Sequence, residues 1–201
     1  ESVDNPKEFY ETNVIGTTNL MRAAVKHKVK RVVFASSSSI YGVQDKLPFR
    51  EDMMPNPQCP YAISKRTAEL IMRYYADNYD IETVSLRYFN VIGPRQDLTS
   101  KYAMVIPAFI THLMKGTKPI IYGDGTQERD FSDVFDVVTA TISAAESKNV
   151  GQGEVINISG NNVISVNELL DRLQDIMGTD IEPIHADKRK GDVPITWADT
   201  T

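Results

Sequence analysis

The sequence lacks several features, and each absence excludes a class of protein. It contains one cysteine, Cys59, so no disulfide can form within the chain, and we expect a reducing, cytoplasmic location. No apolar run approaches the roughly 20 residues that span a bilayer, and the chain opens without the basic and apolar regions of a signal peptide. Lys and Arg number 22 against 27 Asp and Glu, a net charge of −5, whereas sequence-independent binding to nucleic acid requires a basic excess. We therefore expect neither a membrane nor a nucleic acid as a partner.

The sequence also lacks a metal-binding pattern. Its three histidines, His27, His112 and His185, are far apart and have no carboxylate or thiolate neighbours at ligand spacing. Cys59 has no matching histidine and acid, which favours a packed or loop thiol over a nucleophile. We expect no metal site.

The sequence does contain an alternation of short β-rich runs and helical stretches. Its composition, 41% hydrophobic and 24% charged, is typical of a globular protein. The run Arg31-Val-Val-Phe-Ala35 is typical of a strand buried in a parallel sheet. The pattern predicts helices over residues 7–27, 61–79, 104–115, 133–147 and 165–177, and strands over 31–35, 83–89, 119–122 and 154–158. This alternation predicts an α/β fold, a doubly wound and mostly parallel sheet covered on both faces.

Local signals refine this outline. Asn5-Pro6 is an N-cap and N1 pair, and Ser165-x-x-Glu168 is a capping box. After about residue 95 the predicted strands shorten and the loops lengthen. We expect a main sheet domain over residues 1–95 and a smaller C-terminal lobe, mainly over 96–201, with segments that return to the sheet.

Two polar segments point to chemistry. Tyr61 and Lys65 are four residues apart, which places a phenol and an ammonium on one face of a helix. A tyrosine has a pKa of about 10, and a nearby positive charge lowers it, so the pair can serve as an acid/base device. Alone this pattern is weak, because such a pair is usually a solvated helix edge.

The second segment is Ala35-Ser-Ser-Ser-Ser-Ile-Tyr-Gly42, which follows directly on a predicted strand. In a parallel sheet this location puts hydroxyl groups at the carboxyl edge, where ligands bind. A loop that caps the next helix is the alternative interpretation. The two segments together, in a strand, loop and helix context, are far more specific than either one.

With these motifs the chain resembles the extended short-chain dehydrogenase/reductase family and, within it, the NAD-dependent sugar-nucleotide epimerases. The resemblance covers nearly the whole chain. It is carried by Asn13-Val-Ile-Gly-Thr17, Ser36-Ser-Ser-Ser-Ile-Tyr-Gly42, Pro60-Tyr-Ala-Ile-Ser-Lys65, Leu86-Arg-Tyr-Phe-Asn90, Gly93-Pro-Arg95, Gly123-Asp-Gly-Thr-Gln-Glu-Arg-Asp-Phe131 and Gly191-Asp-Val-Pro194. It implies a Rossmann-like sheet with a substrate lobe, NAD as the cofactor and a homodimer.

The resemblance also implies roles for residues at matching positions. Ser37 matches the residue that hydrogen-bonds the sugar hydroxyl being oxidised, Tyr61 the acid/base, and Lys65 the lysine that holds the nicotinamide ribose and lowers the tyrosine pKa. The cofactor-binding positions are Asn13, Ser36, Ser37, Tyr61, Lys65 and Phe89.

On the substrate side, Asn90 matches a residue that contacts the phosphates of the nucleotide sugar. Arg129 and Arg189 match two arginines that approach the diphosphate, to which a planar guanidinium binds in bidentate fashion. For either arginine alone, a surface salt bridge would be the better interpretation. Thr196, seven residues after Arg189, matches a position beside the C2 substituent of the sugar. A residue this small leaves space for an acetamido group, which favours UDP-N-acetylglucosamine and UDP-N-acetylgalactosamine as accepted substrates.

The implied function is reversible C4 epimerisation of a UDP-sugar. A sugar-nucleotide 4,6-dehydratase is a second reading, but that chemistry needs an Asp-Glu pair where this sequence has Ser38 and Ser39. A ketone reductase would consume NAD(P)H. A hypothesis from outside the enzymes is a non-catalytic fragment that binds a nucleotide sugar.

The main departure from the family is the missing Gly-x-x-Gly-x-x-Gly turn, which binds the dinucleotide pyrophosphate at a helix N-terminus. We expect the sequence to be truncated at both ends. We also expect the 201 residues alone to bind no NAD and to aggregate, because the apolar run Val32–Phe34 would leave a sheet edge open.

Overall fold

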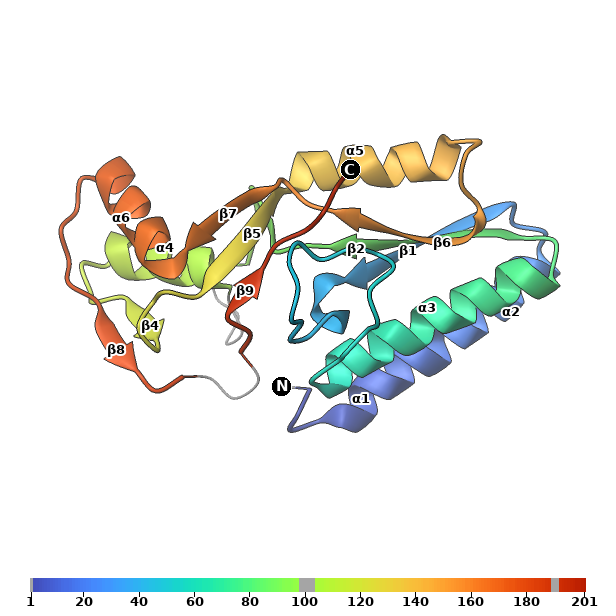
Figure 1. Cartoon of the computed structure of the whole chain (residues 1–201), viewed down its shortest axis with the longest axis horizontal. Helices are drawn as coiled ribbons and strands as arrows, with labels where there is room; N and C mark the ends of the chain where they lie inside the picture. The colour runs from blue at the N-terminus through green and yellow to red at the C-terminus, as the bar shows by residue number, and fades with distance from the viewer. Residues whose placement is uncertain (1, 98–103, 189–191) are drawn as a thin grey trace.

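The computed structural model describes residues 2–97, 104–188 and 192–201. Its main sheet has three parallel strands in the order β1-β2-β6, which are Arg31–Ser37, Glu82–Tyr88 and Gln152–Ile158. The helices α2 (Gly16–Lys26) and α3 (Pro60–Asn78) lie on one face of this sheet, and α5 (Val134–Glu146) lies on the other (Figure 1). The predicted α/β class with helices on both faces is confirmed.

The strand β1 is an edge strand and is only partly buried. Val32, Val33 and Phe34 are half-buried, and Ala35 is exposed. Within the described residues β1 pairs with β2 alone, so one side of the strand has no neighbouring strand. This half-burial is in keeping with the open sheet edge expected at Val32–Phe34 for these 201 residues.

The first predicted helix is continuous but not uniform. It consists of α1 (Pro6–Tyr10), one π-helical turn (Glu11–Ile15) and α2. Pro6 occupies the first turn as predicted. Asn5 is the N-cap residue, but its amide donates to the Glu8 carboxylate instead of accepting a backbone N–H, so the capping hydrogen bond is absent. Single π-helical turns often occur at functional sites, and this one contains Asn13.

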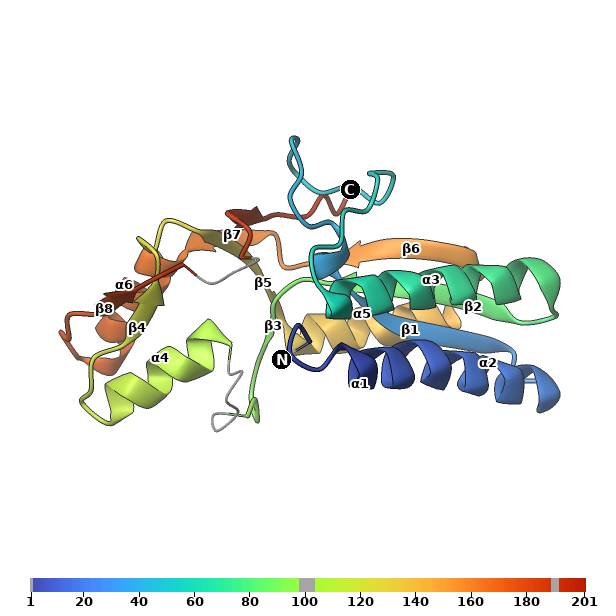
Figure 2. The same cartoon turned by 90° about the horizontal axis from the view of Figure 1, so that it is seen from below.

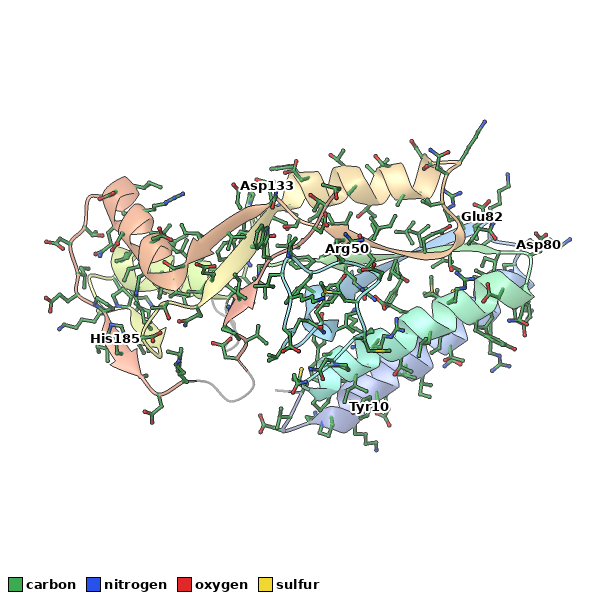
Figure 3. The ribbon with its side chains drawn as sticks, viewed as in Figure 1. Tyr10, Arg50, Asp80, Glu82, Asp133 and His185 are labelled. Carbon is green, nitrogen blue, oxygen red and sulfur yellow. The ribbon has the colours of Figure 1, made fainter. Side chains whose placement is uncertain are left out.

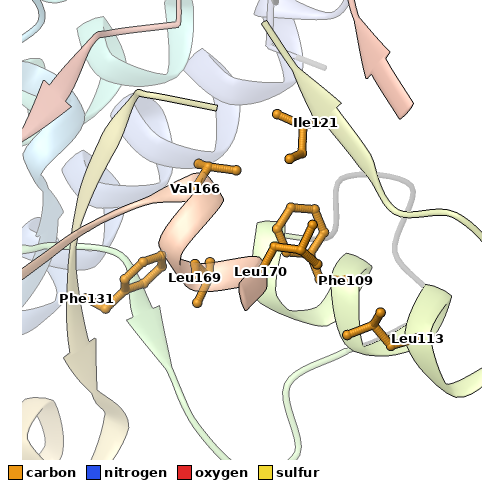
Figure 4. Packing of buried hydrophobic residues seen from close by; sticks show 7 residues of the cluster. All are labelled: Phe109, Leu113, Ile121, Phe131, Val166, Leu169 and Leu170. Carbon is orange, nitrogen blue, oxygen red and sulfur yellow. The ribbon is translucent and has the colours of Figure 1, made fainter. Parts of the chain in front are cut away.

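A smaller lobe lies beyond the carboxyl edge of the main sheet (Figure 2). It contains α4 (Val105–Met114), α6 (Val166–Met177) and the parallel pair β4 (Ile120–Tyr122) and β8 (Ile184–Ala186). The predicted capping box at the start of α6 is confirmed. The lobe has its own core, shown in Figure 4, of Phe109, Leu113, Ile121, Phe131, Val166, Leu169 and Leu170.

A second sheet joins the lobe to the main sheet. Its strand β5 (Glu128–Asp133) pairs in parallel with β3 (Val91–Ile92) and β9 (Ile195–Thr196), and antiparallel with β7 (Asn162–Ser165). The sequence did not predict β3, β5, β7, β8 or β9, because strands this short carry little periodicity. These strands bring segments from both halves of the chain to one place, and where a domain boundary falls stays a prediction.

The long loop between β1 and α3 is fixed by the C-terminal segment. The Phe49 backbone N–H donates to the Trp197 carbonyl, and the Asp199 N–H donates to the Phe49 carbonyl. Arg50, labelled in Figure 3, also lies within 3.7 Å of the Asp199 carboxylate. This loop therefore has a defined course over the carboxyl edge of β1.

Candidate active site

The carboxyl edge of the main sheet opens into a cavity of about 550 Å³. The register of β1 and β2 sets Ser37 opposite Tyr88, so the serine segment and Asn90 emerge side by side. Seven of the predicted site residues line this cavity: Ser36, Ser37, Tyr61, Lys65, Asn90, Arg129 and Thr196. Arg189 lies outside the described residues, and Asn13 and Phe89 are not part of the lining.

Ser37 is held by its own segment. It is the N-cap of a short 3₁₀-helix, Ser38–Ile40, and its Oγ accepts hydrogen bonds from the Ser39 backbone N–H at 3.2 Å and the Ser39 hydroxyl at 3.0 Å. Ser37 also lies beside the Tyr61 phenol on the cavity wall, close enough to lower the pKa of the tyrosine. The serine and the tyrosine therefore meet, as the spacing of the two motifs predicted.

Burial dominates the ionisation of Tyr61. Desolvation raises the pKa of Tyr61, the hydrogen bond to Ser37 lowers it, and the nearby Cys59 raises it further. Lys65 is not among the groups that shift this pKa, so its lowering of the Tyr61 pKa stays a prediction. The Lys65 ammonium lies 5.8 Å from the centre of the Tyr61 ring and donates to the Ala35 carbonyl at 2.9 Å. Burial in turn lowers the pKa of Lys65.

The opposite side of the cavity comes from distant segments. The Asn90 amide donates to the Asp130 carbonyl at 2.8 Å and to the Thr196 hydroxyl at 3.0 Å. The same hydroxyl oxygen accepts from the Asp130 backbone N–H at 3.2 Å. Thr196 thus lines the cavity, and its hydroxyl also ties β9 to β5.

Arg129 stands at the junction of this cavity with a second one. One nitrogen of its guanidinium donates to the Glu128 carbonyl, and another pairs with the Asp192 carboxylate at 2.5 Å. Asp192 belongs to the motif Gly191-Asp-Val-Pro194, which predicted no role for it. Its side chain lies on the cavity wall as the partner of Arg129.

The second cavity, of about 350 Å³, shares Asn90, Met104, Arg129 and Asp192 with the first. Its remaining wall comes mostly from the small lobe and is largely apolar and aromatic: Val105, Ala108, Phe109, His112, Ile120, Ile121, Tyr122, Gln127, Phe131 and Val166. The sequence gave no signal for it, because these residues belong to segments that only the folded lobe brings together. A ligand that extends through both cavities would place its middle portion beside Arg129.

Three predicted cofactor residues have side chains engaged with the protein. Asn13 donates to the Ser64 hydroxyl at 2.9 Å, Phe89 is fully buried against the Tyr41 ring, and the Ser36 hydroxyl donates to the Glu69 carboxylate at 2.7 Å. Their roles in cofactor binding stay predictions.

No group of three or more His, Cys, Asp or Glu side chains in the described part of the chain could hold a metal ion. Among the same residues, no helix is both long and apolar enough to cross a membrane.

The fold and the site define a class before any relative is considered: an α/β protein with a Rossmann-like sheet and a serine, a tyrosine and a lysine at its carboxyl edge. Comparison with family models narrows this class. The NAD dependent epimerase/dehydratase family matches residues 1–159, and the chain belongs to that family.

Similar proteins support the assignment. The chain is 38% identical over 201 residues to a UDP-glucuronate 4-epimerase of Thermodesulfobacterium geofontis, covering 98% of this chain and 59% of that protein. Among solved structures it resembles a UDP-N-acetylglucosamine 4-epimerase from Methanobrevibacter ruminantium M1 in complex with UDP-N-acetylmuramic acid, with a TM-score of 0.95 and 38% identity over 100% of this chain and 64% of the other. A dTDP-glucose 4,6-dehydratase from Streptomyces venezuelae gives a TM-score of 0.89 and 30% identity over 99% and 60% of the two chains. The chain thus spans about three fifths of the length of these relatives.

Proposed function

We propose that the full-length protein is an NAD-dependent UDP-sugar 4-epimerase. The observation that carries this proposal is the meeting of Ser37, Tyr61 and Lys65 in a cavity that continues past Arg129 into an apolar one. Two of the similar proteins described above are named as 4-epimerases of UDP-sugars, which supports the same reading.

In this proposal the inner residues move a proton. Tyr61 takes the proton of the sugar 4-hydroxyl and later returns it, and Ser37 holds that hydroxyl in hydrogen-bond reach of the phenol. Lys65 stabilises the phenolate once it forms, because a positive charge favours the ionised tyrosine. NAD, when bound, supplies the hydride acceptor and donor at C4.

The cavity fits one end of that cofactor. Lys65 and the serine segment offer hydroxyl and ammonium donors at the carboxyl edge of β1, which suit the nicotinamide ribose. No Gly-x-x-Gly-x-x-Gly turn occurs in the 201 residues, so the groups that receive the pyrophosphate belong outside them.

The outer residues bind the nucleotide. Arg129 can exchange its contact with Asp192 for the substrate diphosphate, since a guanidinium pairs well with phosphate oxygens. The sugar then points toward Ser37, and the nucleoside enters the apolar cavity. Space beside Thr196 supports acceptance of N-acetylated sugars.

We further propose a cytoplasmic homodimer. Ile63, Leu70 and Tyr74 are exposed along one face of α3, and Leu20 is exposed on the neighbouring α2. Apolar helix faces of this kind suit helix packing between two copies. Sedimentation velocity tests the homodimer, and a monomer at all accessible concentrations contradicts it.

A single cysteine supports the cytoplasmic location, and cell fractionation tests it.

The test of the function is a product analysis with the full-length protein. We expect UDP-glucose and UDP-N-acetylglucosamine each to give their 4-epimer, detected by NMR, with no net change in NADH absorbance. A 4-keto-6-deoxy product would make the protein a dehydratase, and stoichiometric use of NAD(P)H would make it a reductase. Tight binding of the UDP-sugar without any turnover would support a non-catalytic role.

A further inference from the structure

A buried ion pair lies beneath the serine segment and takes no part in the chemistry described so far. Glu69 on α3 and Arg87 on β2 have side chains that are 3% and 1% exposed. Two parallel hydrogen bonds of 2.9 Å join them, from Arg87 Nε to Glu69 Oε1 and from Arg87 Nη2 to Glu69 Oε2. This bidentate geometry fixes the relative position of the helix and the strand.

The same carboxylate also binds the catalytic strand. The Ser36 hydroxyl donates to Glu69 Oε1 at 2.7 Å, and Ser36 directly precedes Ser37 on β1. Glu69 lies four residues after Lys65 and eight after Tyr61, on the same helix. One carboxylate therefore joins the helix that carries the phenol to the strand that carries the serine.

The chemistry of the pair favours a geometric role. Removing two charges from water is costly, and a buried ion pair is on average no more stabilising than apolar residues of similar volume. Among the described residues, Arg87 Nη1 has no hydrogen-bond partner, and the guanidinium lies 4.7 Å from the centre of the Tyr41 ring. The pair instead joins three elements through hydrogen bonds of defined direction: Glu69 on α3 binds Arg87 on β2 and Ser36 on β1.

We propose that Glu69 and Arg87 are positioning residues that hold the end of β1 against α3, so that the Ser37 hydroxyl stays beside the Tyr61 phenol. The proposal rests on the proposed function, in which this contact orients the sugar hydroxyl. In this arrangement the Ser36 hydroxyl connects the Glu69 carboxylate to β1.

The experiment compares Ser36→Ala and Glu69→Gln in the full-length protein with Ser85→Ala as the matched control. Ser85 is as buried as Ser36 and lies on β2, but it does not line the cavity. The first readout is kcat and KM for the UDP-sugar. The second is the phenolate titration of Tyr61, obtained as the ultraviolet difference between each protein and the same protein carrying Tyr61→Phe.

We expect Ser36→Ala and Glu69→Gln to lower kcat roughly tenfold to a hundredfold, the scale of a misplacement of about 1 Å, with little change in KM. Tyr61 should titrate at higher pH in both, because the Ser37 hydroxyl, which lowers the pKa of Tyr61, moves away from the phenol. The other titratable groups near the phenol, Lys65, Cys59, Arg129 and Asp192, are unchanged in these variants. Ser85→Ala should leave both readouts at the wild-type value.

Wild-type kcat and wild-type Tyr61 titration in a folded Ser36→Ala protein would overturn the proposal. So would a loss of thermal stability with an unchanged titration, since that is the result of a purely structural role. If Glu69→Gln does not fold, the kcat and the Tyr61 titration of Ser36→Ala still test the positioning proposal. A wild-type protein that converts no UDP-sugar overturns the proposed function alone, because the Tyr61 titration tests the positioning without turnover.

Discussion

The two walls of the cavity are built in opposite ways. The inner wall (Ser37, Tyr61 and Lys65) comes from one strand and the helix that follows it. The outer wall (Asn90, Arg129 and Thr196) comes from segments far apart in the sequence, which β5 and β9 bring together. Under the proposed function, the inner wall holds the reacting groups on two neighbouring elements, and the outer wall contacts the rest of the ligand.

The electrostatics of the two walls differ as well. On the inner wall burial acts against charge, since it raises the pKa of Tyr61 and lowers the pKa of Lys65. On the outer wall, the charge of Arg129 is already balanced by Asp192, whose side chain is 34% exposed. Changes to the inner wall should therefore affect kcat, and changes to the outer wall should affect KM.

The largest expected effect is that of Tyr61→Phe on the inner wall. It removes the proton acceptor, so kcat should fall by roughly 10²- to 10⁴-fold, the usual scale of general acid–base catalysis, while KM changes little. Steady-state kinetics with the full-length protein measure this, and Tyr79→Phe, an exposed tyrosine at the C-cap of the same helix, is the control. Full activity in Tyr61→Phe would refute the mechanism.

The next effect concerns the outer wall. Arg129→Ala should raise KM roughly tenfold to a hundredfold, because a hydrogen bond to a charged group contributes about 1.5–3 kcal/mol, and kcat at saturation should change little. Arg172→Ala, a change at an exposed arginine of α6 outside both cavities, is the control. A fall in kcat with constant KM would break the proposed division between the walls.

The same difference explains what the sequence could predict. Ser37, Tyr61 and Lys65 were recognised because helical spacing and the strand before the serines are local patterns, and the structure brings all three together. The major helices and the strands of the main sheet were predicted for the same reason, with boundaries that differ by a few residues.

Features that depend on distant contacts were not predictable in this way. Nothing in the sequence pairs Asp192 with Arg129 or Glu69 with Arg87, because each pair forms only when strands or helices from separate segments pack. The burial that raises the pKa of Tyr61 was not predictable either, since a four-residue spacing gives no information on burial or on the carbonyl that binds Lys65.

A smaller effect is expected from Lys65→Met, and it tests the inner wall through pH. Activity requires the Tyr61 phenolate, and loss of a nearby positive charge raises the pKa of the phenol. The rise of kcat with pH should shift upward by about one unit, which corresponds to roughly tenfold at a fixed pH below the pKa. Lys46→Met, at an exposed lysine, is the control. A profile with an unchanged midpoint would show that Lys65 does not set the ionisation of Tyr61.

The smallest expected effect on overall activity is at Thr196, where the outer wall meets the sugar. Its side chain is 8% exposed and accepts hydrogen bonds from Asn90 and from the Asp130 N–H, so volume and hydroxyl must be tested separately. Thr196→Val keeps the volume and removes the acceptor, which should cost about 1 kcal/mol of stability without changing the preference between sugars.

Thr196→Tyr instead fills space beside the sugar. It should lower kcat/KM for the N-acetylated pair relative to the UDP-glucose and UDP-galactose pair by roughly tenfold or more, the effect of steric exclusion of a small group. Competition assays with both pairs measure the ratio directly. If Thr196→Tyr lowers kcat/KM equally for both sugar pairs, and Thr196→Val lowers it by the same factor, residue 196 acts only through its hydrogen bonds to Asn90 and Asp130. A change in the ratio for Thr196→Tyr alone would instead show that the outer wall, which binds the substrate, also selects it.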